Sequence, residues 1–209
     1  MTSARIMGDS VSLSAIPTDV QIAAFYDDGL YSVAAADVEK RFPSAKYGWC
    51  RIDVTGGAPQ AQVRDWETGD KSGSLEQWVI DHNEASGRKD AVVYCDRSTI
   101  GQVRAGTGSQ VLGADYHLWV STLDGTVVTA GPEHLGSAPY TYPGVIACQV
   151  KGAQLTGGDY DLSLVYDGTL WLPVAPPPKP VLVTKEEAQA AVSAIIANTA
   201  RLAVYVAQG

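Results

Sequence analysis

Residues 91–100 read AVVYCDRSTI, which is a continuous apolar run followed by an aspartate and by hydroxyl side chains that can open a helix. Residues 144–148, GVIAC, form a second run of this kind. Strands that are apolar throughout are typical of sheets covered on both faces. The helical spacing over residues 74–85, between the predicted strands at 61–66 and 91–95, predicts a βαβ unit. The pattern therefore favours an α/β fold, and periodicity alone leaves both a closed β/α barrel and a doubly wound open sheet possible.

The composition limits the classes of function. The 209 residues, 45% of them hydrophobic, are enough for one sizeable core and an appendage. A net charge of −8 without a Lys/Arg cluster argues against a nucleic-acid partner. No apolar stretch is long enough to span a membrane, and residues 1–17 lack the apolar core of a signal peptide. We therefore expect neither a membrane anchor nor a secretion signal.

The cysteines and histidines indicate no metal site. Cys50, Cys95 and Cys148 are odd in number, far apart and each within an apolar run, so we expect buried, reduced thiols. The three histidines show no metal-ligand spacing. The sequence therefore predicts no disulfide, no metal and no cofactor.

The chain divides into four predicted parts. Residues 1–17 resemble an irregular N-terminal arm, residues 18–172 form the α/β domain, and residues 173–183 form a stiff proline-rich linker. Residues 184–209 begin with a capping box and continue with apolar positions at 4,3 spacing, which predicts a separate helix with a short a/d seam. This helix either packs back on its own domain or, as the rigid linker favours, meets another subunit or partner protein.

Acidic residues recur at the predicted strand ends, namely Asp27, Asp28, Asp53, Asp65, Glu67 and Asp96. In a β/α barrel these ends form the mouth where active sites are built. Within Asp65-Trp66-Glu67 the two carboxylates project to one side of a strand and Trp66 to the other. Paired carboxylates are the usual equipment of glycoside hydrolysis, although the same pattern is common at solvated strand ends. Trp66 is the candidate for stacking on a sugar.

A series of segments in family order resembles the family-25 glycoside hydrolases, the phage and bacterial lysozymes, and in particular a shortened actinobacterial and actinophage type. The segments are IAAFYDDG (22–29), YGWCRIDVTG (47–56), VRDWETGD (63–70), AVVYCDRSTI (91–100), LWVSTLDGT (118–126), VIACQV (145–150) and YDLSLVYD (160–167). The resemblance implies a compact or degenerate (β/α) TIM-like barrel over most of the chain.

The resemblance also implies roles for individual residues. Glu67 would be the general acid, and Asp65 would assist the oxocarbenium-like centre or position the acetamido group of the substrate. Asp28 and Asp161 would orient or tune this pair. Gln149 would bind sugar, and Asp27, Asp53, Trp66 and Asp96 would complete the substrate-binding mouth. Because adjacent strand residues point to opposite faces, the sequence does not decide whether Asp27 or Asp28 faces the cleft.

The chain is shorter than a full barrel of about 250 residues, and little sequence separates Val54 from Ala61. The carboxylate pair, the shortened barrel and the predicted C-terminal helix leave three functions open. The first is a virion-associated lysozyme-like protein that binds and hydrolyses peptidoglycan or another cell-wall glycan. The second is a non-catalytic tail or capsid-decoration protein that uses residues 184–207 to self-associate as a homo-oligomer or to dock on other virion proteins. The third is a carbohydrate-binding module without catalysis. For either of the two virion-associated functions, we expect the protein to be assembled into the virion in the host cytoplasm.

Overall fold

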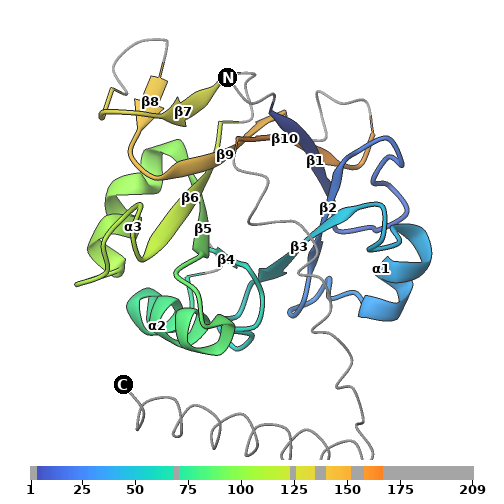
Figure 1. Ribbon diagram of the computed structural model, residues 1–209, viewed down its shortest axis with the longest axis horizontal. Helices are drawn as coiled ribbons and strands as arrows, with labels where there is room; N and C mark the ends of the chain where they lie inside the picture. The colour runs from blue at the N-terminus through green and yellow to red at the C-terminus, as the bar shows by residue number, and fades with distance from the viewer. Residues whose placement is uncertain (1–3, 68–70, 123–125, 135–139, 152–157, 167–209) are drawn as a thin grey trace, which may run out of the picture. The chain divides into compact units, whose positions relative to one another are not determined.

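The computed structural model describes residues 4–67, 71–122, 126–134, 140–151 and 158–166. Eight of its strands close into a barrel in the order β1-β10-β9-β6-β5-β4-β3-β2 (Figure 1). This arrangement decides between the two predicted topologies in favour of the barrel. Two further strands, β7 and β8, form a small parallel sheet of their own.

The predicted linker at 173–183 and the predicted helix at 184–209 lie outside the described residues. The same holds for the expected docking of that helix. Among the described residues, no helix has the length and apolar character needed to cross a membrane.

The strand bounds follow the apolar runs closely. The barrel strands are β1 (Arg5–Asp9), β2 (Ile22–Tyr26), β3 (Gly48–Asp53), β4 (Val63–Asp65), β5 (Ala91–Asp96), β6 (Tyr116–Ser121), β9 (Val145–Lys151) and β10 (Asp161–Val165). The outer pair comprises β7 (Val128–Ala130) and β8 (Tyr140–Tyr142), inserted between β6 and β9.

The barrel is mixed rather than all-parallel, which corrects the TIM-like expectation. Strand β10 runs antiparallel to both of its neighbours, β1 and β9, whereas every other neighbouring pair in the barrel is parallel. A TIM barrel has eight parallel strands, each followed by a helix. Here only three α-helices accompany the described strands, so the fold is an α/β closed barrel of reduced form.

Three α-helices and one 3₁₀ turn lie outside the ring of strands (Figure 1). They are α1 (Ala35–Arg41), α2 (Leu75–Ser86), η1 (Arg97–Thr99) and α3 (Ile100–Gly106). The predicted start of α2 is confirmed, because the Ser74 hydroxyl accepts a hydrogen bond from the Gln77 backbone N–H and Gly87 ends the helix in the left-handed conformation. The predicted cap of α1 at Ser32 is wrong, since that helix follows Ala34.

Strand β1 lies within the segment expected to be an irregular arm. Met7 and Asp9 pair with Ile22 and Ala24 of β2, and on the other side Asp9 pairs with Asp161 of β10. Because β1 joins the last barrel strand to β2, it closes the barrel. It contributes only Met7 to the apolar lumen, while Ile6 is 42% exposed, so its sequence lacks the apolar run that marks the other strands.

Two apolar layers hold the barrel and its helices. Inside the barrel, residues such as Met7, Ile52, Val63 and Trp119 fill the lumen. Outside it, Trp66, Trp78 and Val103 belong to a second cluster that joins α2 and α3 to the strands. The strands are therefore buried on both faces, as their continuous apolar runs predicted.

Candidate functional site

The lumen of the barrel changes from apolar to polar towards the carboxyl ends of the parallel strands. Strand alternation and register align the side chains that face the lumen at that end. They come from six strands and comprise Asp9, Tyr26, Asp65, Tyr94, Gln149 and Asp161, and Glu67 follows directly after β4. We refer to these seven residues as the carboxyl mouth.

Asp9 is one of the two most buried acids of the carboxyl mouth, the other being Asp65. It is 5% exposed, and its Oδ1 atom accepts no hydrogen bond from any residue that the structure describes. Burial raises the pKa of Asp9 well above its ordinary value, and the negative charges of Asp161, Asp65 and Glu67 raise it further. Carboxyl groups from three strand ends therefore act on one another.

Asp65 ends β4 and Glu67 follows it outside the strand, and the charges of both residues act on Asp9. The Glu67 backbone N–H donates to Asp65 Oδ1 at 3.2 Å, which holds the two residues in a tight turn. Both negative charges contribute to the raised pKa values of Tyr26 and Tyr94, whose first cause is burial. Asp65 is 5% exposed whereas Glu67 is half-buried, so Glu67 is the more accessible of the pair.

Gln149 links two members of the mouth. Its Oε1 accepts a hydrogen bond from the Tyr94 hydroxyl, and its Nε2 donates to Asp161 Oδ2 at 2.6 Å. With 1% exposure, it offers almost no surface to a sugar. In this arrangement the side chain orients Asp161 and Tyr94, and the direct sugar contact expected of Gln149 stays a prediction.

The sequence analysis missed three members of the mouth. Asp9 was overlooked because the strand that carries it was not predicted. Tyr26 and Tyr94 were read as strand residues only, although Tyr26 is the last residue of β2 and Tyr94 lies two residues before the end of β5, both on the lumen side. Tyr94 packs against Trp119 with ring centroids 4.7 Å apart, so the floor of the mouth is aromatic. The acid that ends β1, Gly8-Asp9, was the available signal for Asp9.

Asp27 and Asp28 do not join the carboxyl mouth. Asp27 forms an ion pair with Arg51 at 2.5 Å and accepts a hydrogen bond from Gln60 at 3.0 Å. Asp28 accepts from the Val54 N–H at 2.7 Å and from the N–H and hydroxyl of Thr55, so it fastens the loop after β3. Burial alone would raise the pKa of Asp28, but these hydrogen bonds outweigh it and lower the pKa. Asp28 therefore has a structural role in this loop, and the tuning role expected of it stays a prediction.

Asp53 and Asp96 also have structural partners, and neither belongs to the seven residues of the carboxyl mouth. The fully buried Asp53 faces outward from β3 and accepts hydrogen bonds from Gly56 N–H, Ala58 N–H and Trp78 Nε1 at 2.6–2.9 Å. Asp96 caps η1 by accepting from the Ser98 N–H at 2.7 Å.

Trp66 lies in the apolar cluster outside the barrel rather than in the carboxyl mouth. It is 9% exposed, belongs to the cluster under α2 and α3, and lies below the Arg64 guanidinium at 5.5 Å. It therefore packs the helices against the barrel.

The described residues contain no group of three His, Cys, Asp or Glu side chains that could hold a metal ion. The three cysteines are buried and free of disulfides, as predicted.

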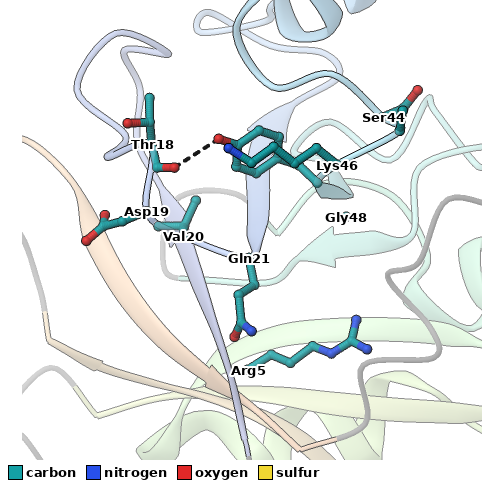
Figure 2. Close-up of a pocket in the computed structure, with 10 residues that line it drawn as sticks. Arg5, Thr18, Asp19, Val20, Gln21, Ser44, Lys46 and Gly48 are labelled. Atoms are coloured by element: carbon teal, nitrogen blue, oxygen red, sulfur yellow. Dashed lines mark hydrogen bonds between the residues drawn. The ribbon is translucent and has the colours of Figure 1, made fainter.

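A pocket of about 560 Å³ lies at the other ends of β1, β2 and β3 (Figure 2). It is lined in part by Arg5, Asp19, Gln21 and Lys46, and the Tyr47 hydroxyl donates to the Thr18 carbonyl at its edge. Arg5 begins the strand that Asp9 ends, which separates this pocket from the carboxyl mouth by about 13 Å along β1. It is thus a separate feature of the barrel.

Comparison with known proteins adds little to this geometry. No protein-family model matches the chain, and no curated protein is significantly similar to it. A crystal structure of an uncharacterized protein from B. stearothermophilus aligns with 77% of this chain and 95% of its own, with a TM-score of 0.49 and 12% sequence identity. A similarity of this size carries no statement about function.

Proposed function

We propose that this protein is a lysozyme-like barrel that binds cell-wall glycan at the carboxyl mouth and hydrolyses it there. The observation that supports this proposal is the convergence of four carboxyl groups, from β1, from the end of β4 and from β10, on one another and on two tyrosines. Glycoside hydrolysis requires one carboxyl group that gives a proton while another stays ionised. A cluster of mutually repelling carboxyls favours such a division of protonation states.

The burial of each group suggests its role. Glu67 is half-buried at the rim, so it is the group placed to reach a glycosidic oxygen and act as general acid. Asp65, tied to the Glu67 N–H, is placed to remain ionised and face the positive charge that develops on the sugar. Asp161 is held by Gln149 and supports the same charge. Asp9 lies beneath them.

The reaction follows from these positions. Glu67 transfers its proton to the glycosidic oxygen as the bond from that oxygen to the anomeric carbon breaks, and the leaving sugar departs as an alcohol. The oxocarbenium-like carbon then carries positive charge beside Asp65 and Asp161. Water adds to this carbon and returns a proton to Glu67, which restores the starting state.

The test is the release of reducing ends from purified actinobacterial peptidoglycan, with wild type beside Glu67→Gln. We expect wild type to release them and Glu67→Gln to lose at least about 100-fold in rate with an unchanged circular dichroism spectrum. Asp27→Asn is the matched control, because Asp27 is an acid at a neighbouring strand end that is paired with Arg51, and it should keep full rate. Folded wild-type protein that leaves several cell walls uncleaved would contradict hydrolysis.

A second function, a non-catalytic virion component, is favoured by the reduced form of the barrel. The link from β3 to β4 contains no helix, so the substrate cleft has fewer walls than in a full β/α barrel. In this case the protein sediments with cell walls, or assembles with virion proteins, and releases no reducing ends. Attachment through residues 184–207 would be lost when those residues are deleted.

A further inference from the structure

We infer that the carboxyl mouth selects a glycan with a free, positively charged amino group, that is, an amino sugar without its N-acetyl group. This inference rests on the proposed function and specifies its substrate class. The argument has three parts: an unpartnered carboxyl oxygen, an excess of negative charge and the arrangement of the groups around it.

The unpartnered oxygen is Asp9 Oδ1. It is buried in the lumen, and no donor among the described residues reaches it. A buried carboxyl oxygen without a donor is unfavourable, and structures usually retain such a group where a ligand completes it. Directly across the antiparallel β1–β10 pair lies a second acid, Asp161. A ligand that enters here meets two carboxyl groups together.

The charges that act most strongly on Asp9 are all negative, namely Asp161, Asp65 and Glu67. Nearby cations are engaged elsewhere. The buried Arg64 guanidinium donates to the backbone carbonyls of Asp53, Asp65 and Ser72 at 2.7–3.0 Å, on the outer side of the strands. Arg51 is paired with Asp27. A ligand that brings a positive charge is therefore favoured over a neutral one.

The arrangement suits an ammonium group rather than a metal ion. The described acids do not form a group of three that could coordinate a metal. They are instead distributed over β1, β10 and the end of β4, with the tyrosine hydroxyls of β2 and β5 between them. An ammonium group has three N–H donors for separate carboxyl groups, and the hydroxyls of the same sugar can bond to the tyrosines.

The protonation state of Asp9 also predicts how the affinity for the ligand depends on pH. Its raised pKa means that Asp9 ionises later than an exposed aspartate. The groups that face it are Asp161, Asp65 and Glu67, with Tyr26 of β2 and the Cys50 thiol of β3 also sensing its charge. A bound ammonium favours ionised Asp9, so affinity rises with pH until the ligand amine itself loses its proton.

The experiment is titration calorimetry with a β-1,4-linked glucosamine tetrasaccharide and with its fully N-acetylated counterpart, in mildly acidic buffer. We expect wild type to bind the amino form about tenfold more tightly or better, since a charge-assisted hydrogen bond distinguishes the two. Asp9→Asn should lose that preference, and Asp161→Asn should reduce it. Asp27→Asn, the same isosteric change in an acid paired with Arg51, should retain it.

The outcomes separate this inference from the proposed function. Equal binding of the two tetrasaccharides by a wild type that cleaves cell walls would overturn the amine preference and leave hydrolysis standing. A clear, Asp9-dependent preference in a protein that cleaves nothing would support the amine site and overturn hydrolysis. A preference that survives in both Asp9→Asn and Asp161→Asn would place amine recognition elsewhere and overturn the inference.

Discussion

Two groups of aspartates at the same end of the barrel have opposite environments. Asp28 and Asp53 accept several hydrogen bonds each, from the loop after β3 and from α2. Asp9 faces other acids and has an oxygen without a donor among the described residues. Both groups lie at or just after strand ends, so position alone does not distinguish them. The difference shows what distinguishes the two groups. An acid that accepts hydrogen bonds from nearby backbone N–H groups holds a loop, whereas Asp9 keeps an oxygen to which no described residue donates.

The largest effect on stability should come from Asp53. Asp53→Ala leaves Gly56 N–H, Ala58 N–H and the Trp78 indole N–H without their acceptor in a buried region. We expect the free energy of unfolding, measured by urea denaturation, to fall by about 3 kcal/mol. Asp27→Ala, which removes a partly buried ion pair with Arg51, should cost less, about 1 kcal/mol. Equal effects of the two changes would show that the buried donors around Asp53 contribute no more than one ion pair.

Substitution of Asp9 should change stability in the opposite direction to substitution of Asp53, that is, it should stabilise the protein. Because its pKa in the folded protein is raised, folding is disfavoured as pH rises from the unfolded value of about 3.9 through the folded value. Asp9→Asn removes this penalty, so the variant should be more stable than wild type at neutral pH, by on the order of 1 kcal/mol. The gain should vanish in acid. Denaturation over a pH series measures it, and a loss of stability at neutral pH would mean that the Asp9 carboxylate is stabilised by a partner.

The smallest effect should come from Asp28, which is partly exposed. Its lowered pKa means that it contributes stability above the unfolded value, and that this contribution is lost as pH falls through the folded value. Asp28→Asn should therefore cost about 0.5 kcal/mol at neutral pH and nothing in strong acid, since solvent screens the interaction. The same pH series serves as the measurement. A cost that persists in strong acid would assign the effect to packing.

Much of the fold could be predicted from apolar runs, because strands such as β5, β6 and β9 are buried on both faces and carry local signals. Strand β1 could not be predicted in this way. Its place in the barrel depends on pairing with β10 and β2, and its own sequence shows only a weak alternation of apolar and polar residues. The loss of Asp9 from the predicted site follows directly from this. The reversed direction of β10 is likewise set by pairing across the chain.

The candidate site was predicted in the same uneven way. The nearness of Asp65 and Glu67 follows from their positions two residues apart, although Glu67 lies beyond the end of β4 and the period of two in a strand does not extend to it. Gln149 and Asp161 were located through family resemblance, and the structure adds that Gln149 is buried and bonded to Asp161. The hydrogen bonds of Asp28, Asp53 and Asp96 could not be predicted because their donors are mostly backbone N–H groups, which a sequence pattern does not reveal.

The most direct test of the functional distinction between these two groups of acids is NMR mapping of bound glycan on isotope-labelled Glu67→Gln protein, using soluble cell-wall fragments. We predict shift changes concentrated at Asp9, Asp65, Tyr94 and Asp161, with the loop that Asp28 and Asp53 hold left unchanged. Changes confined to that loop, or to the pocket around Arg5 and Lys46, would contradict the assignment of the carboxyl mouth as the glycan site.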